Sequence, residues 1–234
     1  MNEKQIKESG SPLKYKWLQH GMLFTGNFTE LKKALADPAT VHLPQFSMYP
    51  NIYECSPELC DIVDICDVGS LMINDSLKVV TENIRRASAA GNKHLKARLK
   101  NSLPCITHTG VFMPRANSGL IMPAFSYQLD CDNVQGIDHH IDAMLKDEQL
   151  DIMLITKSVS GTGIKALLSL TEIISLADHW TYQDYREAYK QAHELIATHF
   201  LEAYGLKVDG QMKTISQPFF LFHSPELFIN NKYQ

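Results

Sequence analysis

Short apolar runs and stretches with helical periodicity alternate along the 234-residue chain, and this pattern predicts a mixed α+β protein. In the first half it predicts a helix over 31–36, a strand over 40–46, a helix that starts at Ser56-Pro57-Glu58, and a helix from about Asp75 that breaks at Gly91-Asn92 and ends at Pro104. The segment "CDIVDIC", residues 60–66, resembles one apolar helix face. The stretches "CITHTGVF" and "GLIMPAFSYQLDCD" are typical of strands.

A clearer rhythm begins near residue 123 and predicts strand, helix, strand, tight turn, strand, helix, strand. After the strand that ends near Asp132 these elements are, in order, a helix over Ile137–Lys146, the strands "LDIMLIT" and "GIKALLSL", a long helix that ends at Gly205, and the strand "QPFFLFHS". We therefore expect a disordered lead at 1–15, an N-terminal lobe at 16–122 and a second lobe at 123–234, with a cleft between the lobes.

The charge distribution adds a local feature to an otherwise ordinary composition with a net charge of −4. No acidic residue lies between Glu82 and Asp130. That interval contains seven cations: Arg85, Arg86, Lys93, Lys96, Arg98, Lys100 and Arg115. A run of this kind is either a solvated helix face or a surface for nucleic-acid phosphates, and the sequence leaves both interpretations open.

Two acids one residue apart end the strand "FSYQLDCDNVQG". On an extended chain Asp130 and Asp132 point to the same side, so their repulsion calls for a positive partner, for which a divalent metal is the usual choice. The alternative is a solvated strand end before a turn.

The stretch "TKSVSGTGIKALL", residues 156–168, places hydroxyls and glycines in a turn before Lys165. Such turns expose N–H and O–H groups that bind phosphate. A Walker-type loop is excluded because Ile164 separates Gly163 from Lys165. A dinucleotide fingerprint would require a helix from about residue 163, whereas a β-hairpin would turn the set toward the two aspartates. A plain connecting turn is also common.

Five cysteines at irregular spacing fit no disulfide framework, and the polar N-terminus lacks an apolar run, so we expect a cytoplasmic protein with no membrane segment. Zinc binding by Cys55, Cys60, Cys66 and His42 is an alternative, although the spacing is not that of a zinc knuckle.

The order "LKARLKNSLPCITHTGVF", "LDCDN" and "SVSGTGIKALL" resembles the primase-like N-terminal domain of bacterial mobile-element proteins, which often precedes a VirE-like or helicase-type ATPase region. That domain is assigned to the archaeo-eukaryotic primase (primase-polymerase) superfamily. The resemblance covers roughly residues 75–232. It implies a primase-polymerase-like, two-lobed fold in which an RRM-like C-terminal sheet carries the active site.

The resemblance also implies roles for individual residues. Asp130 and Asp132 would be catalytic ligands of Mg²⁺ or Mn²⁺. The turn would hold the phosphates of a nucleoside triphosphate through Ser158, Ser160, Gly161, Gly163 and Lys165. DNA, with RNA as an alternative, would contact Lys93, Lys96, Arg98, Lys100 and Arg115.

The third motif departs from the family pattern. In "SQPFFLFHSPELFINN", Gln217 replaces an arginine and Ser224 replaces the acid, with His223 beside it. A serine hydroxyl is a poorer metal ligand than a carboxylate. Either another acid such as Asp209 replaces it, or catalysis is lost and binding remains.

Two hypotheses follow from these residues. The first is a primase-polymerase-like domain that binds metal-nucleotide and DNA, with weakened nucleotidyl transfer in mobile-element replication and a helicase-type ATPase partner. The second is a non-catalytic nucleic-acid-binding or partner-docking module that kept the fold.

Overall fold

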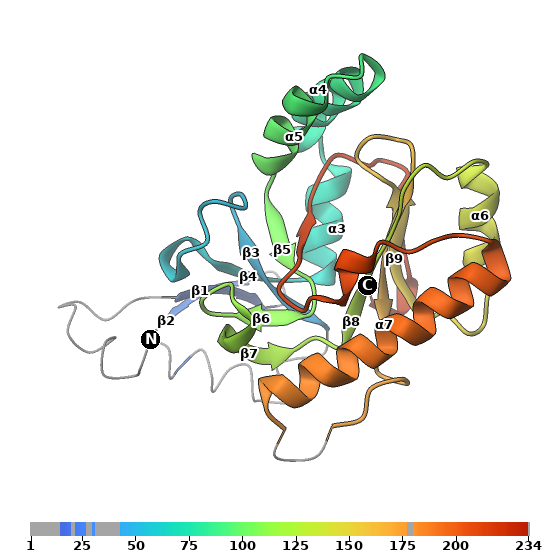
Figure 1. The fold of residues 1–234 in the computed structure, drawn as a ribbon. Coiled ribbons are helices and arrows are strands. Elements are labelled where there is room, and N and C mark those ends of the chain that lie inside the picture. The colour runs from blue at the N-terminus through green and yellow to red at the C-terminus, as the bar shows by residue number, and fades with distance from the viewer. Residues whose placement is uncertain (1–14, 20–21, 27–29, 31–42, 177–179, 234) are drawn as a thin grey trace.

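The computed structural model describes residues 15–19, 22–26, 30, 43–176 and 180–233, and it is mixed α+β as expected (Figure 1). The predictions for 1–14, for the helix at 31–36 and for the strand start at 40–42 lie outside the described residues. The described chain forms a six-stranded, a four-stranded and a two-stranded sheet. Among the described residues, no helix combines the length and apolar character that crossing a bilayer demands.

The six-stranded sheet gathers strands from both halves of the chain. Its order is β11 (Pro218–Phe220), β5 (Cys105–Thr107), β3 (Gln45–Tyr49), β4 (Asp61–Asp64), β1 (Tyr15–Gln19) and β2 (Met22–Gly26). All neighbours are antiparallel except β1 and β4, which are parallel. Because β11 pairs with β5, the predicted last strand "QPFFLFHS" is not part of the sheet that contains Asp130.

The four-stranded sheet has the order β12 (Phe228–Ile229), β9 (Ile152–Lys157), β10 (Ile164–Ser169) and β8 (Ser126–Cys131), with every neighbour antiparallel. The predicted strands near 126–132, 150–156 and 163–170 are therefore confirmed. A separate ribbon joins β6 (Gly110–Phe112) to β7 (Leu120–Pro123), so each of the two long predicted strands before Asp132 is in fact two short ones.

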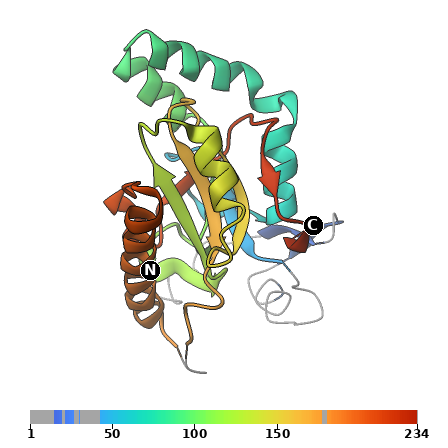
Figure 2. The same ribbon diagram turned by 90° about the vertical axis from the view of Figure 1, so that its right-hand side faces the viewer.

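One face of the four-stranded sheet is covered by α6 (Ile137–Met144) and α7 (Tyr182–Tyr204) (Figure 2). The helix α7 begins with a capping box at Thr181 and Asp184, and it ends at Gly205, whose φ of 65° is the left-handed conformation typical of a helix C-terminus. Its tyrosines Tyr185 and Tyr189 are fully buried against β8 and β10. These aromatics are core residues.

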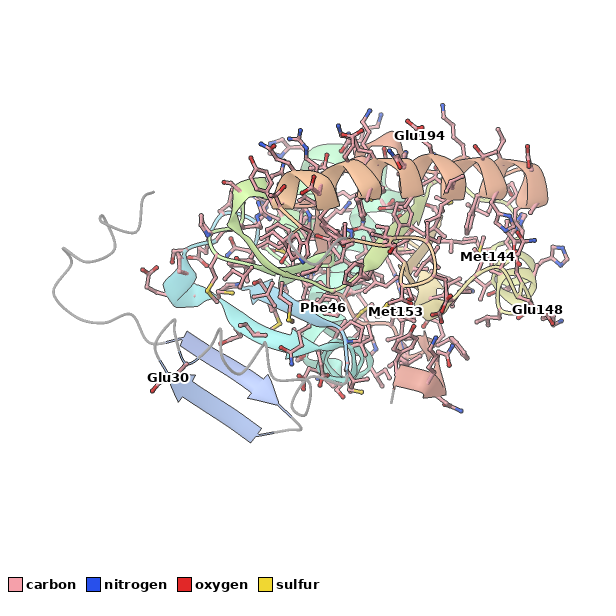
Figure 3. All side chains as sticks on the ribbon, turned by 90° about the horizontal axis from the view of Figure 1, so that it is seen from below. Glu30, Phe46, Met144, Glu148, Met153 and Glu194 are labelled. Atoms are coloured by element: carbon pink, nitrogen blue, oxygen red, sulfur yellow. The ribbon has the colours of Figure 1, made fainter. Side chains whose placement is uncertain are left out.

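The opposite face of the sheet packs on the six-stranded sheet and on α3 (Ile65–Ile73). Phe46 of β3 and Met153 of β9 belong to this second core, and both are labelled in Figure 3. The predicted helix at "CDIVDIC" is wrong, because residues 61–64 form β4. Asp64 then accepts hydrogen bonds from the N–H groups of Cys66 (2.8 Å) and Asp67 (3.0 Å), so it caps α3 and fixes where that helix starts. Upstream, Pro57–Leu59 is only one 3₁₀ turn.

A helical hairpin formed by α4 (Lys78–Ala89) and α5 (Lys93–Asn101) lies beyond α3, at the top of Figure 1. Gly91, with φ of 67°, makes the turn between them, and Asn92 caps α5 by accepting the N–H of Leu95 at 3.0 Å. The predicted helix break at Gly91-Asn92 is confirmed.

The core between the two sheets gives a stability test. Leu154 of β9 is fully buried and pairs in register with Leu167, so Leu154→Ala is expected to lower the free energy of unfolding by about 2–5 kcal/mol in urea titrations. Leu201→Ala, on the exposed side of α7, is the matched control and is expected to change it by less than about 0.5 kcal/mol. Equal losses for the two variants would contradict the packing described.

Candidate functional site

Three polar side chains form a row across three strands of the four-stranded sheet, near the end where the turn between β9 and β10 lies. Lys165 of β10 is paired in register with Asp130 of β8 on one side and with Thr156 of β9 on the other. Directly opposed residues of a sheet share a face, so the three side chains project to the same side. Asp130, near the end of β8, and Lys165, which follows the turn at residues 158–163 (the Ser/Gly turn), are thus brought together. Asp132 lies just beyond the end of β8 and is exposed.

The lysine and the first aspartate form a buried ion pair. The Nζ atom of Lys165 lies 2.8 Å from Oδ2 of Asp130, and the side chains are 3% and 14% exposed. The same Nζ lies 5.1 Å from the centre of the Phe219 ring, which is within the range of a cation–π contact. The ammonium of Lys165 is therefore neutralised inside the protein and is not presented to solvent.

The turn between β9 and β10 carries a chain of hydroxyls. Ser158 Oγ lies 3.2 Å from Ser160 Oγ, which lies 3.0 Å from Thr162 Oγ1. Gly161 has φ of 76°, and a side chain at Gly163 would place its Cβ 2.3 Å from the carbonyl oxygen of Cys131. The segment is a β-hairpin, so the helix that a dinucleotide fingerprint requires is not there: Ile164–Ser169 is a strand.

The basic hairpin α4–α5 adjoins this turn. Arg85 donates from Nε to the carbonyl of Val159 at 3.4 Å. Lys100 lies close enough to Lys165 for their like charges to interact, and its pKa is lowered, first by burial and then by the charge of Lys165. Lys78, at the start of α4, lies 3.4 Å from Asp75. Within the described part of the chain, none of the six hairpin cations after Glu82 forms an ion pair with a carboxylate; they are Arg85, Arg86, Lys93, Lys96, Arg98 and Lys100.

The last of the predicted basic residues lies elsewhere. Arg115, in the loop after β6, donates to the carbonyl of Ile52 at 3.3 Å and lies 4.0 Å from the sulfur of Cys105. Its guanidinium is engaged beside the six-stranded sheet, and the structure does not bring it to the Asp130 row.

The residues of the third motif make structural contacts. The Ser224 hydroxyl is hydrogen-bonded to that of Thr156, and its N–H donates to Met72 at 2.7 Å. The N–H of His223 donates to Thr81 Oγ1 at 2.9 Å. The carbonyl of Gln217 accepts from the His108 ring at 3.1 Å. Ser224 thus contacts the row through Thr156, which is separated from Asp130 by Lys165.

These donors do not fit a catalytic metal centre. A divalent cation such as Mg²⁺ needs several oxygens around one point, but Asp130 already accepts an ammonium, and the hydroxyl of Ser224 is bonded to Thr156, whose strand is two strand spacings (about 10 Å) from that of Asp130. The suggested substitute, Asp209, uses its side chain to accept the N–H of Gln211 at 2.9 Å. Among the described residues no cluster of three or more His, Cys, Asp or Glu side chains could hold a metal. The same finding applies to zinc binding by Cys55, Cys60 and Cys66. The fourth suggested ligand, His42, lies outside the described residues.

Sequence reasoning missed two members of the site. Thr156 was overlooked although it is a polar residue inside the apolar strand "LDIMLIT", which is a visible signal. Phe219 could not have been found, because its strand belongs to the other sheet and reaches Lys165 only through the tertiary fold.

Together the fold and the site define an α+β domain whose central antiparallel sheet carries a buried ion pair beside a basic helical hairpin. A family model described as BT4734-like, N-terminal domain matches residues 98–228, more than half of the chain, and the protein belongs to this family. The matched segment includes Asp130, Asp132, the Ser/Gly turn and Ser224. Comparison with curated proteins and with solved structures finds no match.

The ion pair predicts a non-additive pattern of stabilities. Asp130→Asn leaves a buried ammonium without its carboxylate and is expected to lower the free energy of unfolding by about 3–5 kcal/mol. The double variant Asp130→Asn/Lys165→Met removes both charges and is expected to recover most of that loss. Urea unfolding at neutral pH of Asp130→Asn, Lys165→Met and the double variant measures these values, and a loss in the double variant equal to the sum of the two single losses would contradict a buried pair.

Proposed function

We propose that this protein is a nucleic-acid-binding domain whose α4–α5 hairpin contacts the phosphate backbone, and that it keeps a primase-polymerase-like arrangement without metal-dependent catalysis. The observation that carries the proposal is the part of the hairpin after Glu82: it has six cations and no acid, none of the six forms an ion pair with a described residue, and Arg85 contacts the Ser/Gly turn. From the resemblance we extend the proposal to DNA as the ligand and to a helicase-type ATPase as a partner in mobile-element replication.

Electrostatics favour a polyanion at this surface. A cation with no carboxylate partner is available to a phosphate. When it neutralises a phosphate, counterions condensed on the nucleic acid are released into solution, and this release favours binding. The net charge of −4 makes the rest of the molecule acidic, so the attraction is confined to the hairpin and its surroundings. Binding of this kind is independent of base sequence and strongly dependent on salt.

The non-catalytic form of the proposal is supported by the chemistry of the row. Asp130 forms an ion pair with Lys165, and the hydroxyl of Ser224 is hydrogen-bonded to that of Thr156. Nucleotidyl transfer with two metals would require carboxylates that converge on the ions and a lysine that is free to meet phosphate. For this reason we assign no catalytic step to these residues.

Charge reversal on α5 tests the proposal. Lys96→Glu/Arg98→Glu is expected to weaken binding of fluorescein-labelled DNA and to reduce the slope of log Kd against log salt by about 2, because each phosphate that is no longer neutralised lowers that slope by about 0.9. The matched control Lys146→Glu/Lys207→Glu changes the net charge equally at exposed positions away from the hairpin, and its slope is expected to stay near that of the parent. Fluorescence anisotropy across salt concentrations gives both slopes, and equal slopes for the two double variants would refute a hairpin contact.

Metal-nucleotide binding is the second candidate, favoured by the position of Asp130 and Asp132 at the end of β8 beside the hydroxyls of the turn. It would require Lys165 to exchange Asp130 for a phosphate. Isothermal titration with a nucleoside triphosphate and Mn²⁺ separates the two candidates. Our proposal expects no Mn²⁺-dependent binding, whereas the second candidate expects binding that Asp132→Asn weakens and the exposed control Asp142→Asn does not. Primer extension by the parent protein would overturn the non-catalytic proposal.

A further inference from the structure

A trough of about 400 Å³ lies along the helical hairpin. All of its lining residues belong to α4, to α5 or to the turn between these helices, and none of the described sheet residues lines it. In Figure 1 the hairpin is at the top of the molecule, beyond α3. The trough is therefore separate from the Asp130 row and from both cores.

The apolar part of the trough has the composition of a contact between helices. Ala87 and Ala90 are three residues apart at the end of α4, and Leu95 and Leu99 are four residues apart on α5, so each pair lies on one face of its helix. Small and large aliphatic side chains on two neighbouring helices form holes that accept the side chains of a third helix. Among the described residues no aromatic side chain lines the trough, whereas aromatic rings are the usual platform for a nucleotide base.

The apolar side of the hairpin is incompletely covered by the described part of the chain. Leu95 and Leu99 are only half-buried, and no residue of α5 is fully buried. Val79, one turn before Asn83 on the same face of α4, is 69% exposed. The helix α5 has nine residues, and helices of that length depend on packing of an apolar face for their stability. Another helix on this side would supply that packing.

The charges at the trough indicate which kind of helix fits. Arg86 lines the trough, and Lys96 lies one turn after Asn92 on α5; neither forms an ion pair with a described carboxylate. Glu82 is the only acidic residue of the two helices. A second copy of the hairpin would bring cations against cations, so charge opposes self-association through this face. A partner with carboxylates beside an apolar face satisfies both requirements.

We propose that the trough binds an acidic amphipathic α-helix of a partner protein, with aliphatic side chains between α4 and α5 and carboxylates facing Arg86 and Lys96. Helix-in-groove recognition of this kind uses anchors at positions i, i+3, i+4 and i+7. The α4 wall extends from Asn83 to Ala90, about 10 Å at 1.5 Å per residue, which is the length of two helical turns. The inference uses two of the cations on which the proposed function rests, so a bound helix and DNA would compete.

Two synthetic peptides test this inference on the parent protein. The first is a fluorescein-labelled peptide of about 14 residues, four helical turns, with leucines on one face and glutamates on the other. The second has the same amino acids in an order that removes the apolar face. Fluorescence anisotropy is expected to show that the first binds at least about tenfold more tightly, because the charges are equal and only the first can place a row of aliphatic side chains in the trough.

Leu95→Gln removes an aliphatic wall of the trough without changing the charge of the hairpin. It is expected to weaken binding of the amphipathic peptide at least about fivefold and to leave the salt slope of DNA binding unchanged. Leu201→Gln makes the same exchange at an exposed position of α7 and is the matched control. If Leu95→Gln lowers the midpoint of thermal unfolding, the comparison of the two peptides on the parent protein decides.

Equal affinities for the two peptides, or equal peptide binding by Leu95→Gln and Leu201→Gln, would overturn the inference. Binding of a single-stranded oligonucleotide that Leu95→Gln weakens, together with no binding of the amphipathic peptide, would assign the trough to a nucleotide base instead. Peptide binding is measured without DNA, and DNA binding is measured on the Lys96→Glu/Arg98→Glu variant without peptide, so the inference and the proposed function can each fail alone.

Discussion

The buried contact between Lys165 and Asp130 sets the chemistry that the central sheet of this protein can support. Two charges removed from water must stay paired, because separating them inside the protein exposes each to the full cost of lost hydration. The pair joins β8 to β10 at the point where the Ser/Gly turn begins, and the ring of Phe219 covers the ammonium. Any anion or metal that approaches the row therefore competes with an internal partner already at 2.8 Å.

The buried ring of His108 makes two further polar contacts near the ion pair. His108 donates from Nδ1 to the carbonyl of Gln217, which can only accept, so Nε2 is free to accept the hydroxyl of Tyr189 at 2.9 Å. Burial lowers the pKa of His108 to about 3, which matches the neutral ring that this bonding requires. The imidazole thus links α7 to the segment that enters β11, and it holds Phe219 where it can cover Lys165.

Local signals in the sequence predicted most of the elements that position the site. They could not predict contacts that depend on pairing between distant strands. The break at Gly91, the end of α7 at Gly205 and the hairpin around Gly161 each depend on a residue suited to a left-handed backbone, so they were visible. The strand β4 was mistaken for a helix because the apolar residues of "CDIVDIC" also suit one face of a helix, whereas Asp61–Asp64 form a strand that ends in the cap of α3. No local pattern could show that β11 pairs with β5, since that partner is more than 100 residues away.

Charge balance explains why the fold accommodates a serine at position 224, where the resemblance to primase-polymerases leads one to expect an acid. Around the row, Asp130 and Asp132 provide two negative charges, while Lys165 and Lys100 provide two positive ones, and Lys100 lies close enough to interact with the other three. This set is neutral without a metal ion. Ser224 is fully buried, so an aspartate there would add a carboxylate with no cation of its own and would have to displace Thr156 from its hydrogen bond or draw Lys165 away from Asp130. A hydroxyl at position 224 and the Lys165–Asp130 pair are therefore two aspects of one arrangement, and this arrangement supports the proposal of a phosphate-binding surface at α4–α5 without metal-dependent catalysis.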